Sequence, residues 1–296
     1  MMRAGGTSSE STGTRLRSLP ARAGIGLRSP HLAEVLATRP ALPWVEVHPE
    51  NYLGGGPAVR ALHALRQDYP VAFHAVGLSI GSATGVDRRH LERITALVER
   101  FEPLLVSEHL AWSQHGGVYL NHLLPLPYTE ESLAVVCRNV DEVQMTLGRP
   151  VLIENPSAYL RFTASAVPEA EFLGELVRRT GCGLLCDVNN VHVTARNLGL
   201  DPIAYLDALP ADAVGEIHLA GHSVNQVEGR TLLIDDHGSP VTGAVWTLYE
   251  HALRRFGAVA TLVEWDSEIP ALGVLMAEAR RADARLLDVT GDAHAA

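Results

Sequence analysis

Eight short apolar segments, each followed by a stretch with helical periodicity, constrain the fold of this chain most strongly. In residues 87–101, for example, Leu91, Ile94, Leu97 and Val98 share one helix face behind a capping Asp87. Strand and helix alternating at this spacing predict parallel strands joined by right-handed crossovers. Eight such units in 296 residues predict an α/β fold, a (β/α)8 TIM barrel. The apolar segments are 24–28, 44–50, 71–77, 104–112, 151–156, 183–190, 213–221 and 260–266.

The barrel accounts for one domain, which we predict over residues 23–287. Residues 1–22 are rich in Ser, Thr, Gly and Arg without periodicity and predict a disordered N-terminal tail, and residues 288–296 predict a flexible C-terminal tail. Besides 87–101, helices are predicted at 57–69, 129–148, 168–181, 201–209, 243–257 and 269–282.

Composition excludes several classes of protein. A hydrophobic fraction of 47% supports a large core, and a net charge of −10 argues against nucleic-acid binding. No secretory signal and no apolar run of 18 residues occur in the sequence, so we expect a cytoplasmic protein without membrane association. The three cysteines match no disulfide framework or zinc motif and are predicted to pack in the core. Complete Rossmann and Walker motifs are also absent.

Side chains that bind metal ions stand at the ends of six consecutive predicted strands. In a (β/α)8 barrel, these carboxyl ends converge on one pocket. Carboxylates within apolar strands are costly to bury unless they are paired or bind a cation, so the pattern predicts a metal site. Histidines and carboxylates without thiolates suit zinc, manganese or iron. The residues are His74, His109, Glu154, Asp187, His218 and Glu264, with Asp235 and His237 in the loop before the last strand.

This set holds more ligands than one ion needs. We therefore predict two ions bridged by Glu154, with a third ion as an alternative. Near the same strand ends lie candidate substrate-binding residues, namely His48, Glu50, Asn51, His222 and Asn225. For Asn51, capping of a turn is an equal alternative. Arg28 is predicted to form a structural ion pair.

Seven segments, in this order, resemble the multinuclear non-haem iron-dependent oxidase (MNIO) family, also called DUF692 or UPF0276. They are HAVGLSIGS, SEHLAW, IENPSAYL, CDVNNVHV, HLAGH, LIDDHGSPV and VEWDSEIPAL, and the similarity covers residues 23–287. The resemblance implies a TIM barrel of the xylose-isomerase-like kind.

The ligand order is more distantly similar to the trinuclear zinc site of endonuclease IV. That likeness implies that His74 and His109 hold one ion, and that Glu154 bridges it to a second. Asp187, His218 and Glu264 would complete the second site and, with Glu154, form the catalytic set. Asp235 and His237 would hold a third ion. Its remaining ligand would be Asn190, where endonuclease IV has histidine, or His192 in its place.

The family resemblance also implies a reaction. Its members use mixed-valent Fe(II)/Fe(III) iron and O2 to oxidise ribosomally synthesised precursor peptides, often at Cys and in some cases at a C-terminal Asp. Many work with a partner protein that binds the leader peptide. Two alternatives remain open: a metal-dependent isomerase or phosphodiesterase of the endonuclease type, and a non-catalytic metal-binding scaffold. The absence of lysine disfavours a lysine-based isomerase, and the acidic charge disfavours a DNA-repair nuclease.

Overall fold

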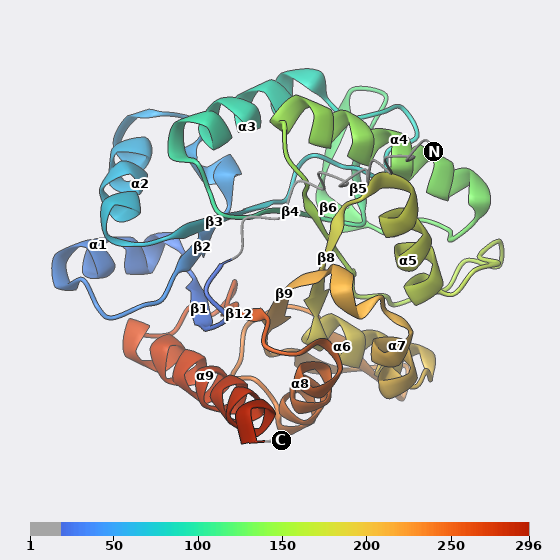
Figure 1. The fold of residues 1–296 in the computed structure, drawn as a ribbon. Helices are drawn as coiled ribbons and strands as arrows, with labels where there is room; N and C mark the ends of the chain where they lie inside the picture. Colours follow the sequence, from blue (N-terminus) through green and yellow to red (C-terminus); the bar gives the residue numbers. More distant parts are fainter. Residues whose placement is uncertain (1–18, 296) are drawn as a thin grey trace, which may run out of the picture.

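A computed structural model describes residues 19–295, with side chains described through Val289. Its centre is a closed barrel of parallel strands in the order β1-β12-β9-β8-β7-β4-β3-β2, surrounded by helices (Figure 1). Each barrel strand overlaps one of the eight predicted segments, so the predicted fold class is confirmed. The barrel strands are β1 (Ala23–Gly26), β2 (Val45–Val47), β3 (Val71–Ala75), β4 (Val106–His109), β7 (Leu152–Glu154), β8 (Gly183–Asp187), β9 (Val214–Leu219) and β12 (Ala260–Val263).

Helices connect these strands in the expected order. The predicted helices form as α2 (Gly56–Asp68), α3 (Arg88–Phe101), α4 (Glu130–Leu147), α5 (Glu169–Thr180), α7 (Pro202–Ala208), α8 (Gly243–Phe256) and α9 (Leu272–Ala295). Two helices were not predicted, α1 (Ser29–Thr38) and α6 (Val188–Leu198). The α6 helix follows β8 without a loop, and its buried first residues, 188–190, fell within the segment predicted as a strand, which hides the boundary between strand and helix. Short 3-10 helices lie at Pro49–Tyr52 (η1) and Ala211–Ala213 (η2).

Two antiparallel hairpins, also absent from the prediction, interrupt the alternation of strand and helix. One pairs β5 (Trp112–His115) with β6 (Val118–Leu124), and the other pairs β10 (Ser223–Val227) with β11 (Arg230–Ile234). Their two-residue turns, Gly116-Gly117 and Glu228-Gly229, have positive φ throughout, as tight hairpin turns require. Both hairpins follow barrel strands, β4 and β9, and therefore emerge at the carboxyl end of the barrel.

At the end where the strands begin, an apolar plug fills the barrel interior. It is formed by Leu19, Trp44, Ala72, Leu105, Leu152, Leu185, Ala260 and Leu262. Gly24 makes room for Trp44, because a Cβ at this position would lie 2.5 Å from the indole Cδ2. Leu19 was predicted to belong to the N-terminal tail, but only 5% of it is exposed. Arg22, also in that predicted tail, pairs with Asp283. The tail prediction for 19–22 is therefore wrong, and residues 1–18 lie outside the described residues.

The predicted C-terminal boundary also changes, because α9 continues through residues 288–295, which we had predicted as a tail. The three cysteines are buried and free, and Cys182 and Cys186 pack in the layer between the barrel and the helices. Burial raises the pKa of Cys182 to about 11. Among the described residues, no helix has the length and apolar character needed to cross a membrane.

Candidate metal centre

The ends of β3, β4 and β7 bring one donor atom each from His74, His109 and Glu154 into a triangle. His74 Nε2 lies 3.1 Å from Glu154 Oε2 and 3.3 Å from His109 Nε2, and His109 Nε2 lies 3.3 Å from Glu154 Oε2. Ligands of one ion at bond lengths near 2.1 Å stand about 3.4 Å apart, so this spacing suits a shared metal. In both imidazoles, the nitrogen outside the triangle has a neighbour that fixes the orientation of the ring. His74 Nδ1 contacts Ser107 Oγ at 2.7 Å, and His109 Nδ1 lies 3.5 Å from Glu108 Oε1.

Glu154 also belongs to a second donor group, with Asp187 and His218. Asp187 ends β8 and caps α6, since its Oδ1 accepts a hydrogen bond of 2.6 Å from the Asn190 backbone N–H. Its Oδ2 has no hydrogen-bond partner among the described residues and faces the other donors. His218, on β9, places Nδ1 3.2 Å from Glu264 Oε2. Two donor groups therefore share the Glu154 carboxylate, the arrangement expected of a bridging ligand.

The loop after β11 brings His237 to the same place. Its Nδ1 lies 3.2 Å from Glu264 Oε2, and its Nε2 lies 2.7 Å from Asp235 Oδ1 and 3.9 Å from Asp187 Oδ2. His237 has a φ of 45°, which is unfavourable for a residue other than glycine and marks a backbone held by its surroundings. Gly221, which follows β9, is required for the close approach of this loop, because a Cβ there would lie 2.1 Å from the Ser239 carbonyl oxygen.

Of the two candidates for the remaining ligand, only Asn190 reaches the cluster. Its Nδ2 donates to Glu154 Oε1 at 3.2 Å, and its Oδ1 is buried without a partner. His192 instead packs against His222, with ring centroids 5.1 Å apart, and belongs to none of the donor groups. Helical geometry explains the difference, because residues two apart on α6 point to different faces.

Three charged residues at the centre were missed by the sequence analysis. Glu46 and Glu216 point into the barrel one layer below His218, and Asp266 lies 3.5 Å from His237 Nδ1. A signal for all three exists in the period of two along a strand: Glu46 precedes His48, Glu216 precedes His218 and Asp266 follows Glu264 by two residues.

Arg28 forms the ion pair that the sequence predicted. It donates to Glu264 Oε1 at 2.6 Å and to Asp266 Oδ1 at 2.5 Å. These contacts fix one oxygen of Glu264 and leave Oε2 directed at His218 and His237.

The predicted substrate-binding residues do not share one location. His48 lines the central cavity, with Nε2 3.7 Å from Glu264 Oε1. Glu50 accepts from the Val76 backbone N–H at 3.0 Å and supports the loop after β3. His222 contacts Asn189 Oδ1 at 2.8 Å, and Asn189 in turn donates to Asp235. Asn51, in η1, and Asn225, on β10, are exposed and do not line the cavity.

Burial and mutual attraction give the clustered groups unusual pKa values. Burial lowers the pKa of His74, but contact with the Glu154 carboxylate outweighs this effect and raises it to about 10. Burial disfavours the charged form of Glu154, yet the charges of His109 and His74 lower its pKa to about 2. For Asp187, burial and the Glu154 charge outweigh the attraction of His237 and raise the pKa to about 8. Protons on the imidazoles therefore balance the carboxylates when no other cation does so.

The donor set fits bound metal ions. Buried polar side chains normally have hydrogen-bond partners, but several donor atoms here have none among the described residues. These atoms belong to residues of the donor groups or of the same cavity, as expected of atoms that ligate an ion. They are Glu154 Oε2, Asp187 Oδ2 and Asn190 Oδ1.

The cluster forms the inner end of a cavity of about 470 Å³. Apolar side chains from β6 and from the loop after β7 line its outer part, namely Leu123, Leu124, Tyr159 and Leu160. Of thirteen large hydrophobic side chains that are exposed among the described residues, nine lie on the two hairpins and this loop. These nine, which we call the apolar rim, are Val118, Tyr119, Leu120, Leu123, Tyr159, Leu160, Phe162, Val224 and Val227.

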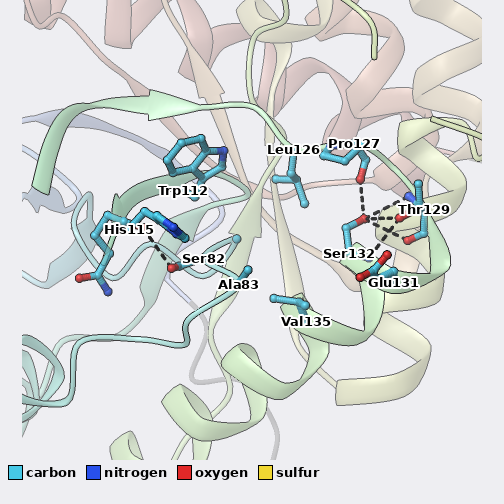
Figure 2. A pocket seen from close by; sticks show the side chains of 12 residues that line it. Ser82, Ala83, Trp112, His115, Leu126, Pro127, Thr129, Glu131, Ser132 and Val135 are labelled. Carbon is cyan, nitrogen blue, oxygen red and sulfur yellow. Dashed lines mark hydrogen bonds between the residues drawn. The ribbon is translucent and has the colours of Figure 1, made fainter. Parts of the chain in front are cut away.

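A second cavity, of about 400 Å³, lies between the β5–β6 hairpin and the start of α4. Figure 2 shows Trp112 on the hairpin side and Val135 on the α4 side. None of the grouped metal donors lines it. The chemistry therefore concentrates in the central cavity.

Several solved structures to which the chain is similar are sugar epimerases. The chain is similar to D-psicose 3-epimerase, with a TM-score of 0.56 and 14% identity over 91% of this chain and 99% of that one. It is also similar to L-ribulose 3-epimerase, with a TM-score of 0.57 and 16% identity over 92% and 94% of the two chains. At these identities the likeness establishes the fold, a xylose-isomerase-like barrel.

Relatives in sequence are much closer. A UPF0276 protein of Vibrio parahaemolyticus is 50% identical over 90% of this chain and 93% of its own length. A UPF0276 protein of an Anaeromyxobacter species is 52% identical over 88% and 90% of the two chains. The family model described as RiPP precursor modification enzyme MbnB/TglH/ChrH matches residues 22–286. The chain therefore belongs to this family of peptide-modifying enzymes, the MNIO or UPF0276 family that its sequence resembled.

Proposed function

We propose that this protein is a multinuclear non-haem iron oxidase that uses O2 to modify a ribosomally synthesised precursor peptide. The modified residue would be Cys, with a C-terminal Asp as the alternative. The observation that carries the proposal is the Glu154 carboxylate, which two groups of metal donors share at the inner end of one cavity. A bridging carboxylate between adjacent ions is the natural basis of a multinuclear centre.

The residues divide among the ions as follows. His74, His109 and Glu154 would hold the first ion, and Glu154, Asp187, His218 and Glu264 the second. Asp235, His237 and Asn190 would hold a third where one binds. Iron in these positions would supply the one-electron chemistry that activates O2. The protein itself would position the peptide and exclude water, since the donors lie at the buried end of the cavity.

The apolar rim supports a peptide as the substrate. Exposed apolar side chains gathered around a cavity mark a binding surface for an apolar or amphipathic partner. A free sugar offers hydroxyl groups rather than apolar surface, so the rim has no evident use in an epimerase. A small leader-peptide-binding protein, encoded nearby, would complete the system, and the reaction would take place in the cytoplasm.

The first experiment is metal analysis of protein produced in iron-replete cells, followed by mass spectrometry of a co-expressed precursor peptide and measurement of oxygen uptake. Two or more iron ions per chain and a peptide of changed mass are expected. The Glu154→Gln variant should lose iron and activity together, because the substitution weakens the binding of both ions. Glu278→Gln, a buried glutamate on α9 outside the cluster, is the matched control and should keep both. An iron-loaded, active Glu154→Gln variant would refute the bridging role.

The same protein distinguishes the alternative functions. Epimerisation of a ketose by protein loaded with Mn²⁺ would favour an isomerase, and cleavage of DNA at abasic sites by zinc-loaded protein would favour a hydrolase. Metal binding without O2 consumption or a change in any peptide would favour a scaffold.

A further inference from the structure

A buried pair of carboxylates, which we call the acidic pair, lies beneath the proposed centre and consists of Glu46 on β2 and Glu216 on β9. Both side chains are 0% exposed, as is His218. His218 Nε2 lies 3.5 Å from Glu46 Oε1 and 3.6 Å from Glu216 Oε1. On the opposite edge of the ring, His218 Nδ1 faces Glu264 Oε2 at 3.2 Å. The ring therefore stands between the donor cluster and the acidic pair.

Apart from His218, no described residue forms an ion pair or hydrogen bond with these two buried carboxylates. All four oxygen atoms of the acidic pair lack hydrogen-bond partners among the described residues. Below them the barrel interior is apolar, with Leu185 and Leu262 in the plug. An unpaired buried carboxylate is costly, so these two require a partner that the ordinary core does not provide. His218 Nε2 is the atom that lies near both carboxylates. It is itself buried and has no hydrogen-bond partner among the described residues.

A neutral imidazole that binds a metal through one nitrogen carries a proton on the other. That N–H usually points at a carboxylate or carbonyl, which fixes the ring and makes the ligating nitrogen more basic. Nδ1 of His218 faces Glu264 Oε2, which is one of the donors, so Nε2–H is the group that needs an acceptor. The acidic pair stands where such an acceptor is required.

We propose that Glu46 and Glu216 are positioning residues of the metal centre. They receive the Nε2–H of His218 and thereby direct Nδ1 to the second ion. This inference rests on the metal centre of the proposed function and adds two residues to it. It also gives a role to the carboxylate that lies two residues before His218 on β9.

The test uses the full-length protein loaded with Co²⁺, whose unpaired electrons shift the resonances of ligand protons. In wild-type protein, NMR should show a shifted, solvent-exchangeable resonance from the Nε2–H of His218, which His218→Ala removes. Glu46→Gln and Glu216→Gln should each move this resonance. In the double variant, Co²⁺ affinity at the second site should fall 10- to 100-fold. Glu278→Gln should match the wild type in both measurements.

The outcomes separate this inference from the proposed function. Wild-type protein that binds no Co²⁺ overturns the metal centre and the inference with it. Wild-type protein that binds two ions but lacks the exchangeable resonance overturns the inference alone. The inference alone is also overturned if the double variant keeps the wild-type affinity for Co²⁺ and its exchangeable resonance does not move. Thermal unfolding of the metal-free variants shows whether a weaker affinity reflects a damaged fold, and the wild-type spectrum decides the matter independently of any variant.

Discussion

Asp187 uses its two carboxylate oxygens for different purposes, and this division can be tested at the residue scale. Oδ1 caps α6 through the Asn190 backbone N–H, whereas Oδ2 faces the metal donors. A carboxylate at the end of a strand can serve as a helix cap or as a metal ligand. The geometry here allows both, because a carboxylate has two oxygens and the end of β8 is also the start of α6.

Asp187→Asn should separate these two roles. Asparagine is a good helix cap, and Asp187, with its pKa raised to about 8, is already largely protonated in the metal-free protein at neutral pH. The metal-free variant should therefore unfold at about the same temperature as wild type. Iron content should fall by at least one ion per chain, because a neutral amide oxygen replaces an anionic ligand. Thermal unfolding with a chelator and metal analysis measure the two effects. A variant that retains all its iron would show that Oδ2 is not a ligand.

Asn190 and His192 provide a second comparison at this scale. Asn190→Ala should reduce the number of bound ions or weaken the last one about 10-fold, since it removes the buried Oδ1 and the contact with Glu154. His192→Ala should leave metal stoichiometry unchanged, because the ring packs on His222. Metal titrations of the two variants, which differ by two positions on one helix, check the assignment. The reverse result would make His192 the ligand.

Among the elements, the hairpins and the loop after β7 carry the apolar rim. Neither hairpin contributes a strand to the barrel, so their exposed apolar side chains do not serve the barrel core. Their position after β4 and β9 places them at the carboxyl end, where barrel enzymes bind substrate. This position is the reason for assigning the rim to substrate binding in the proposed function.

Replacement of two rim residues should weaken peptide binding without disturbing the metal. For Leu123→Ser combined with Leu160→Ser, we expect KM for the peptide to rise about 10-fold or more, since each lost apolar contact is worth about 1 kcal/mol. Iron content and kcat should stay near wild type. Met145→Ser, an exposed apolar residue on α4, is the control and should leave KM unchanged. A fall in kcat with constant KM would place these side chains in the chemistry instead.

For the whole molecule, the proton balance of the buried cluster links stability to pH. The pKa of His74 is raised to about 10, and that of Asp187 to about 8. Both groups bind protons more tightly in the folded state, so their stabilising contribution is complete below the unfolded pKa and is lost as pH rises through the folded one. Glu154, with its pKa lowered to about 2, loses its contribution only as pH falls below the ordinary range for Glu.

The metal-free protein should therefore become less stable between pH 7 and pH 10, and bound metal should remove much of this dependence because metal replaces the protons. Thermal unfolding across this range, with a chelator and with Zn²⁺, measures both curves. His74→Gln should flatten the metal-free curve. A melting temperature that rises with pH in the metal-free protein would contradict the assigned proton balance.

Much of the fold followed from local features of the sequence. The eight strands could be located because a parallel barrel buries both faces of each strand and leaves a continuous apolar run. The hairpins were not found, since β5 and β6 carry little hydrophobic alternation and β6 is almost entirely exposed. Leu19 was assigned to the tail because its burial depends on Trp44 and on strands that are remote in sequence.

The sequence by itself determined the types of donor and the strand ends from which they come, because these depend on the order of residues along each strand. Only the tertiary structure decided which donor atoms meet. Closure of the barrel pairs β1 with β12 and brings side chains hundreds of residues apart within ligand distance. That closure makes Glu154 common to two groups, selects Asn190 over His192, and places Glu46 and Glu216 behind His218. Periodicity along a strand can assign a side chain to the interior, but its neighbours there come from other strands.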